Sequence, residues 1–249
     1  MALDLIPRLA NELGIRPQQA ESAVRLLDEG NTVPFIARYR KEATGSLDDG
    51  KLRALEEKLA SYRAVEARRE DVRRLIGEQG KLDAAVEAAL DAAGSVTEID
   101  DVYRPFRPKR RTRASIAAEA GLTPLAELLW AQEKQTDPAA EALRFVDAEK
   151  GIPDADAALR GAADILAERV SDDADIRKWI REYTFKNGSL VCRAKKKDED
   201  SVYRSYYDYT EPLRRVPPHR ILAIDRGERE EFLTVRVEVN ADYIHTYLQ

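Results

Sequence analysis

The chain has 249 residues, of which 43% are hydrophobic and 35% are charged, and its formal net charge is −5. This composition is typical of a globular chain of one or two domains, and a lone cysteine with two histidines excludes both an intramolecular disulfide and a zinc site. Because no stretch approaches about 18 consecutive uncharged apolar residues and the N-terminus lacks a signal-peptide layout, we expect a cytoplasmic protein without membrane contact.

Most of the sequence predicts helices, because Ala, Leu, Glu, Arg and Lys dominate it and apolar residues recur three or four positions apart. A first helix is expected to end at Gly14, and a second begins at Pro17 and closes at Gly30. After a connection of only about three residues, Pro34 suits the first turn of a third helix that runs to Lys41.

The closely spaced helices within 17–41 have the outline of a helix-turn-helix. A helix-turn-helix usually contacts bases from the start of its second helix, where this chain has Val33–Ile36, which we expect in the core. Nucleic-acid contact and an ordinary helical hairpin therefore both remain open. Three cationic side chains lie at the end of the second helix: Arg38, Arg40 and Lys41.

The longest helical pattern runs from about 48 to 77, and Glu66 and Arg69 interrupt its apolar stripe. A coiled coil would keep its apolar heptads through that point, so we expect a long helix that packs on neighbouring helices. Shorter helices are expected after it, at about 82–93, 97–103, 115–120, 124–132, 138–146, 153–170 and 172–185.

Strands are expected only near the C-terminus, where apolar residues alternate with polar ones at about 190–195 and 233–239. A helix at about 217–227 separates them, so the strands are expected to pair through a crossover rather than a tight hairpin. The predicted fold is mainly α: an elongated multi-helix array with an N-terminal helix-turn-helix and one long helix over 1–187, plus a small α+β piece with two strands over 188–249. Such a piece is marginal alone and should dock on the helical body or continue into further sequence.

The segment 104–113 holds six basic residues and no acid, although the whole chain is acidic. Concentrated positive potential is typical of a phosphate-binding surface, and two prolines stiffen this loop. The alternative is that the cations pair with acidic neighbours, including Asp100 and Asp101. The six residues are Arg104, Arg107, Lys109, Arg110, Arg111 and Arg113.

Catalytic patterns are absent: the sequence has no glycine-rich phosphate loop, paired-histidine helix, nucleophile elbow or zinc spacing. Cys192 falls on an apolar strand face, which favours a buried side chain over a nucleophile. We therefore expect no enzyme activity, no cofactor and no metal.

A cluster of four tyrosines allows either base stacking or packing of a short helix, and packing is favoured. The four residues are Tyr203, Tyr206, Tyr207 and Tyr209.

Three long strings, in this order, resemble the bacterial Tex proteins, which are transcription accessory factors. They are VPFIARYRKEATGSLDD (33–49), DVYRPFRPKRRTRASIAAEAGLTPLA (101–126) and YRSYYDYTEPLRRVPPHRILAIDRGE (203–228). That family resembles the core of a eukaryotic transcription elongation factor that also chaperones histones. In it, a helical region with a helix-turn-helix and a long helix precedes an RNase H-like domain, a helix-hairpin-helix domain and an OB-fold RNA-binding domain.

The resemblance implies that this chain is the N-terminal helical scaffold of such a protein, which stops before those three domains. It also implies a nucleic-acid-binding transcription accessory role, with non-specific association with RNA or DNA through the cations of 104–113 and 38–41. The alternative is a protein-interaction scaffold of the transcription machinery, with nucleic acid bound only by the absent C-terminal domains. A regulatory segment of a nuclease-like enzyme is a more distant alternative.

Overall fold

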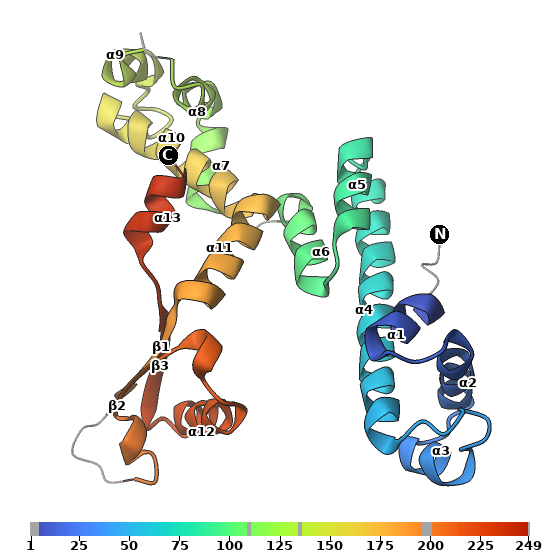
Figure 1. Cartoon of the computed structure of the whole chain (residues 1–249). Helices are drawn as coiled ribbons and strands as arrows, with labels where there is room; N and C mark the ends of the chain where they lie inside the picture. Colours follow the sequence, from blue (N-terminus) through green and yellow to red (C-terminus); the bar gives the residue numbers. More distant parts are fainter. Residues whose placement is uncertain (1–4, 109–110, 134–135, 196–200, 249) are drawn as a thin grey trace. The chain divides into compact units, whose positions relative to one another are not determined.

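The computed structural model describes residues 5–108, 111–133, 136–195 and 201–248 (Figure 1). The chain divides into two compact units, Met1–Pro108 (unit 1) and Lys109–Gln249 (unit 2). The described residues form thirteen α-helices and one small sheet, which confirms the mainly α class. Among them, no helix combines the length and the apolar character that crossing a membrane requires.

Unit 1 begins with three helices packed on the first half of a long fourth helix. They are α1 (Leu5–Leu13), α2 (Pro17–Asp28), α3 (Val33–Tyr39) and α4 (Asp49–Glu78). Gly14 and Gly30 follow α1 and α2 with φ of 61° and 84°, the left-handed conformation that ends a helix and favours glycine. Their core includes Leu9, Ala20, Ile36, Leu52 and Leu55.

The second half of α4 packs against α5 (Ala84–Ala92) and α6 (Val96–Tyr103), which a short 3₁₀ turn, η1 (Arg104–Phe106), follows. The carboxylate of Asp48 caps α4 by accepting a hydrogen bond from the Lys51 amide at 2.7 Å. This second core includes Val72, Ile76, Leu90, Ile99 and Tyr103.

Arg69, one of the two residues that interrupt the apolar stripe of α4, is buried at 5% exposure. Its Nε donates to the Leu90 carbonyl at 2.9 Å, and its Nη2 donates to the Ala93 carbonyl at 2.7 Å. The last carbonyls of a helix have no partner within it, and Arg69 supplies partners at the end of α5. Glu66 pairs with the same guanidinium.

Unit 2 begins with a helical body built around α10 (Ala155–Asp172). Against it pack α7 (Arg113–Glu119), α8 (Thr123–Trp130) and α9 (Pro138–Ala142), the last followed by the 3₁₀ turn η2 (Leu143–Phe145). The helices approach closely where Ala158, Gly161 and Ala162 of α10 face Ala117 and Leu122. Small side chains at these positions let the backbones meet.

The sheet follows α11 (Ala174–Asn187) and has three antiparallel strands in the order β2-β1-β3: β1 (Ser189–Ala194), β2 (Asp208–Pro212) and β3 (Leu233–Glu238). Between β2 and β3 lie the 3₁₀ turn η4 (Leu213–Arg215) and α12 (Pro218–Arg229), and α13 (Ala241–Leu248) comes last.

The prediction of two strands is wrong, because β2 was missed. Its sequence, DYTEP, lacks apolar alternation and ends in proline, which suits an edge strand whose outer side needs no partner. The short helix expected at the tyrosines is only a 3₁₀ turn, η3 (Arg204–Tyr206), before that strand. The final helix, α13, was also missed.

Candidate nucleic-acid interface

The C-terminal end of α3 presents the cations expected there. Arg38, Arg40 and Lys41 are exposed, and none of them forms an ion pair with another described residue. Phe35 and Tyr39 lie among them, with ring centroids 5.2 Å apart and planes tilted by 46°. Tyr39 is 61% exposed. We call these five residues the α3 surface.

Each arginine of the α3 surface lies near an aromatic ring. The guanidinium carbon of Arg40 is 5.4 Å from the Phe35 ring centroid, and that of Arg38 is 6.0 Å from the Tyr39 centroid. Such contacts contribute about 0.5–1 kcal/mol at exposed sites. They restrict the guanidinium groups while leaving N–H donors for an anion, a combination that suits phosphate.

The short sequence of α3 separates this surface from the core. Val33 and Ile36, one turn apart, are buried, and they confirm part of the expected core. The expectation is wrong for Pro34 and Phe35, which are exposed. A seven-residue helix with one buried face cannot bury four consecutive side chains. The predicted helix pair is present, and its role as a helix-turn-helix stays a prediction.

The turn that follows α3 is fixed by residues that sequence reasoning missed. Thr44 is buried, and its hydroxyl lies 3.3 Å from the carbonyls of both Arg40 and Lys41, to which it can donate. The Gln19 Nε2 of α2 donates to the Thr44 carbonyl at 3.2 Å and to the Gly45 carbonyl at 2.9 Å. The Thr44 contacts are local, whereas no local pattern signals those of Gln19, because α2 supplies them from a distant part of the chain.

The first half of the basic segment 104–113 belongs to unit 1 and is paired. Arg107 Nη2 lies 3.1 Å from Asp100 Oδ1, which also accepts from Arg68 at 2.7 Å. Both guanidinium groups lie over the Tyr103 ring, at 5.5 and 5.6 Å from its centroid. Arg104 is half-buried and also has an interaction partner. The pairing alternative thus applies to this half, and buried Tyr103 acts as an anchor.

The second half of the segment belongs to unit 2 and is more accessible. Arg111 and Arg113 are exposed, with guanidinium nitrogens 3.7 Å from Glu119 and 3.3 Å from Asp164. Ion pairs made by arginines this exposed contribute only about 0–1 kcal/mol, so a phosphate can compete for either arginine. Two further site residues fall outside the described residues: Lys109 and Arg110.

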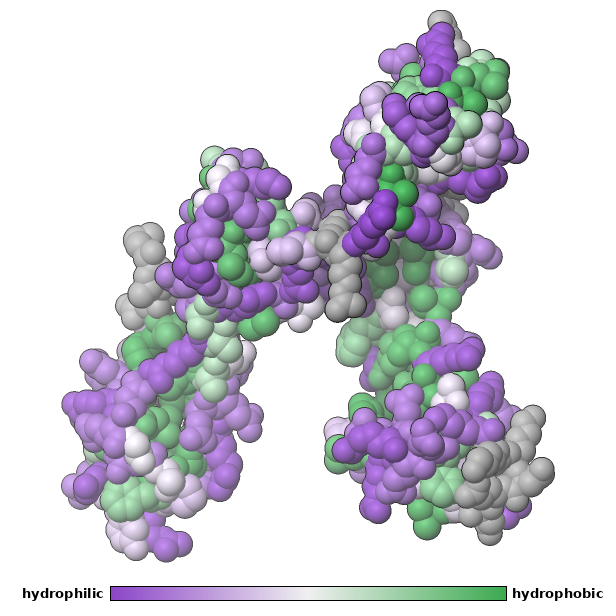
Figure 2. All heavy atoms as spheres, turned by 180° about the vertical axis from the view of Figure 1, so that it is seen from behind, coloured by the Kyte–Doolittle hydropathy of each residue, from purple (hydrophilic) through white to green (hydrophobic). Residues whose placement is uncertain are grey.

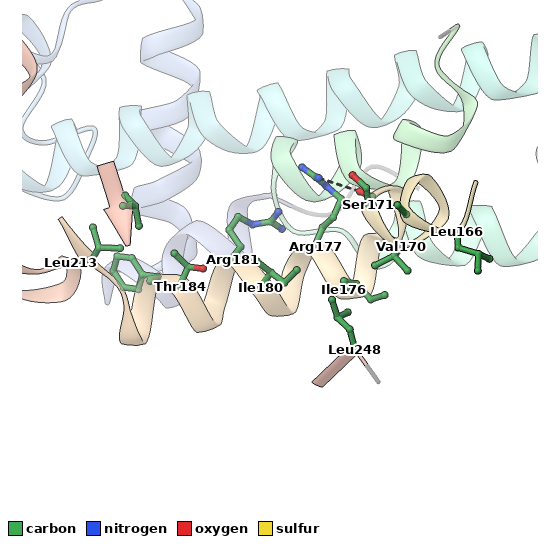
Figure 3. A pocket seen from close by; sticks show the side chains of 13 residues that line it. Leu166, Val170, Ser171, Ile176, Arg177, Ile180, Arg181, Thr184, Leu213 and Leu248 are labelled. Atoms are coloured by element: carbon green, nitrogen blue, oxygen red, sulfur yellow. Dashed lines mark hydrogen bonds between the residues drawn. The ribbon is translucent and has the colours of Figure 1, made fainter. Parts of the chain in front are cut away.

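Unit 2 also carries an apolar groove of about 900 Å³ that none of the expected site residues lines. Its wall comes from α10, α11 and α13, with contributions from Leu213 and β3. Figure 3 shows Ile176 of α11 beside Leu248 of α13, while Arg177 and Arg181 project from the other side of α11. Hydrophobic surface is also visible across the middle of unit 2 in the space-filling view (Figure 2).

Tyr203 of the tyrosine cluster and Cys192 have structural roles. The Tyr203 side chain is buried, its hydroxyl donates to Glu230 at 2.8 Å, and its ring packs near Phe232. Packing is therefore confirmed for this tyrosine. Cys192 is fully buried in the central strand, and burial raises the pKa of its thiol, which disfavours the reactive thiolate. The described residues include no cluster of side chains that could hold a metal ion.

Comparison with known proteins gives two family matches along the chain. Residues 3–77 match the Tex-like protein N-terminal domain, and residues 133–247 match the Tex central region-like family. Protein YhgF of Escherichia coli strain K12 is 50% identical over 236 residues, which cover 94% of this chain and 30% of that protein.

Two further relatives differ in distance from this chain. Transcriptional accessory protein Tex of Neisseria gonorrhoeae is 42% identical over 94% of this chain and 31% of its own length. S1 RNA-binding domain-containing protein 1 of Homo sapiens is 28% identical over 96% of this chain and 25% of its own length. The chain thus spans about a third or less of the relatives it matches. The two matched regions, in their order along the sequence and at this identity, show that the chain belongs to the Tex family.

Proposed function

We propose that this chain is a non-catalytic, nucleic-acid-binding part of a transcription accessory protein that acts in the cytoplasm and contacts RNA or DNA phosphates without reading base sequence. The α3 surface carries the proposal, because its three cations are exposed and pair with no described acid. Phosphate contacts fix a protein on the strand but carry no sequence information.

The names of relatives support the same proposal. One bacterial relative is named a transcriptional accessory protein, and the human relative is named for an S1 RNA-binding domain. Arg111 and Arg113 are the second candidate contact, since both guanidinium groups are exposed and a phosphate can replace their acidic partners. Lys109 and Arg110 complete that candidate as predictions. Other components of the transcription machinery are proposed as protein partners.

A salt titration tests the proposal. The triple variant R38A/R40A/K41A should bind a single-stranded RNA and a duplex DNA more weakly than the unaltered chain, to a similar degree for different sequences. If the three cations contact three phosphates, the slope of log K against log salt should fall by about 2 for the RNA and slightly more for the duplex. Fluorescence anisotropy from about 50 mM salt upward measures both quantities.

The matched control removes the same charge elsewhere. Arg74, Arg226 and Arg229 are exposed, and each already pairs with an acid three or four residues away in the sequence. The variant R74A/R226A/R229A should therefore keep nearly all of the binding. Equal losses in the two triple variants would show that only net charge matters, and an unchanged slope in R38A/R40A/K41A would remove the α3 surface from the proposal.

The apolar groove of unit 2 favours a second candidate, a scaffold for proteins of the transcription machinery. A groove of this size lined by leucine, isoleucine and valine suits an apolar segment of another protein. The same titration separates the two candidates. A chain that serves only as a protein scaffold would bind neither nucleic acid at about 50 mM salt.

A further inference from the structure

Four aromatic rings form a stack between α11 and α13. Trp179 and Tyr183 come from α11, and Tyr243 and Tyr247 come from α13. The Trp179 ring lies 3.5 Å from Tyr247 and 5.2 Å from Tyr183, measured between centroids, and Tyr183 lies 4.9 Å from Tyr243. The planes of these pairs differ by only 4° to 13°. We call these four residues the aromatic stack.

The aromatic stack is not a closed core. Tyr243 is 54% exposed and Tyr247 is 51% exposed, so large parts of both rings face water. Aromatic residues that only join two helices usually bury most of their area, because that burial is the source of their stability. Exposed, nearly parallel rings leave apolar faces free for another flat ring.

A cavity of about 480 Å³ opens beside the stack. Three of the rings line it, together with Glu182, Lys186 and Asn187 of α11. A volume of this size falls within the range of small-molecule sites. Lys186 is exposed and pairs with no described acid. The Asn187 Nδ2 donates to the Tyr183 carbonyl at 3.0 Å, which leaves the Asn187 side-chain oxygen as an acceptor.

We propose that the aromatic stack and its cavity form a base-stacking site for single-stranded nucleic acid. A base extends the stack, and Lys186 contacts its phosphate. Duplexes do not fit, because their base faces are already covered by neighbouring bases. The inference rests on the proposed function and gives it a single-strand preference, located in unit 2 and separate from the α3 surface.

The test compares one RNA as a single strand and as a duplex. The variant Y243A/Y247A should bind the single strand about tenfold more weakly, the loss typical of one stacked base, and should bind the duplex like the unaltered chain. The matched control is F185A, which removes a 65% exposed ring of α11 from outside the stack and should change neither affinity. The ring-retaining variant Y243F/Y247F should keep single-strand binding.

Two readouts keep the test valid if alanine loosens α13. K186A leaves all four rings in place and should weaken single-strand binding alone. In a W130F background, Trp179 is the remaining tryptophan, and its fluorescence should be quenched by the single strand and not by the duplex. Unchanged fluorescence, together with unchanged single-strand affinity in K186A and Y243A/Y247A, would overturn the inference. Failure of the unaltered chain to bind either RNA would instead refute the proposed function itself.

Discussion

Arg69 shows how one charged side chain in an apolar seam can stabilise a helical unit. Its guanidinium donates to the carbonyls of Leu90 and Ala93, which end α5 and have no partners inside that helix. The interaction therefore joins α4 to α5 through the backbone rather than through side-chain packing alone. Glu66 supplies the nearby negative charge.

We predict that Arg69→Met lowers the free energy of unfolding by about 2–4 kcal/mol, because two buried carbonyls lose a charged donor. Urea unfolding followed by circular dichroism measures the change. Arg74→Met is the control on the same helix, since Arg74 is exposed and forms only surface ion pairs. It should change stability by no more than about 1 kcal/mol. Equal effects of the two substitutions would show that the carbonyl contacts of Arg69 are unimportant.

At the scale of elements, α1 is tied to α4 by a polar cluster around Glu12. The carboxylate accepts from Lys58 Nζ at 2.6 Å, from the Tyr62 hydroxyl and from Arg8 Nε at 3.3 Å. These hydrogen bonds, with that from Lys58 the largest contribution, lower the pKa of Glu12 from 4.5 to about 2. The folded state therefore favours the ionised carboxylate.

The sign of the pH effect follows from that shift. A carboxylate whose pKa is lower in the folded state stabilises the fold above its unfolded pKa and loses this contribution as pH falls. We expect the Glu12 contribution to disappear between about pH 4.5 and 2. Thermal unfolding across this window measures the stability of two variants. The stability of Glu12→Gln should depend less on pH than that of the control Glu57→Gln, which alters an exposed carboxylate of α4. Identical pH profiles in the two variants would contradict this role of Glu12.

The helices were predictable because their signals are local. Each signal lies within a few residues of the helix that it marks. A glycine ends α1 and α2, Asp48 caps α4, and apolar residues recur periodically along each helix. The edge strand β2 was not predictable, since its five residues show no apolar alternation and its pairing depends on β1. Helix α13 was missed because its stacking partners lie on α11, far away in the sequence.

For the whole molecule, the sequence identified the cations but not their surroundings. It treated 104–113 as one loop, whereas Arg107 pairs within unit 1 and Arg113 within unit 2. At the α3 surface the cations were anticipated, but the supporting contact of Gln19 with the Thr44 carbonyl depends on tertiary packing. The family resemblance, which rests on long strings rather than on charge, was confirmed by matches over both units.

Cys192 has a practical consequence for experiments on this chain. It is the only thiol in the sequence, and it is fully buried in the central strand of the sheet, which pairs with β2 and β3. A thiol-specific reagent should react only with molecules in which the sheet has opened, so the labelling rate measures that opening without an introduced probe. Mass spectrometry of timed reactions would then report local unfolding of unit 2 separately from that of unit 1.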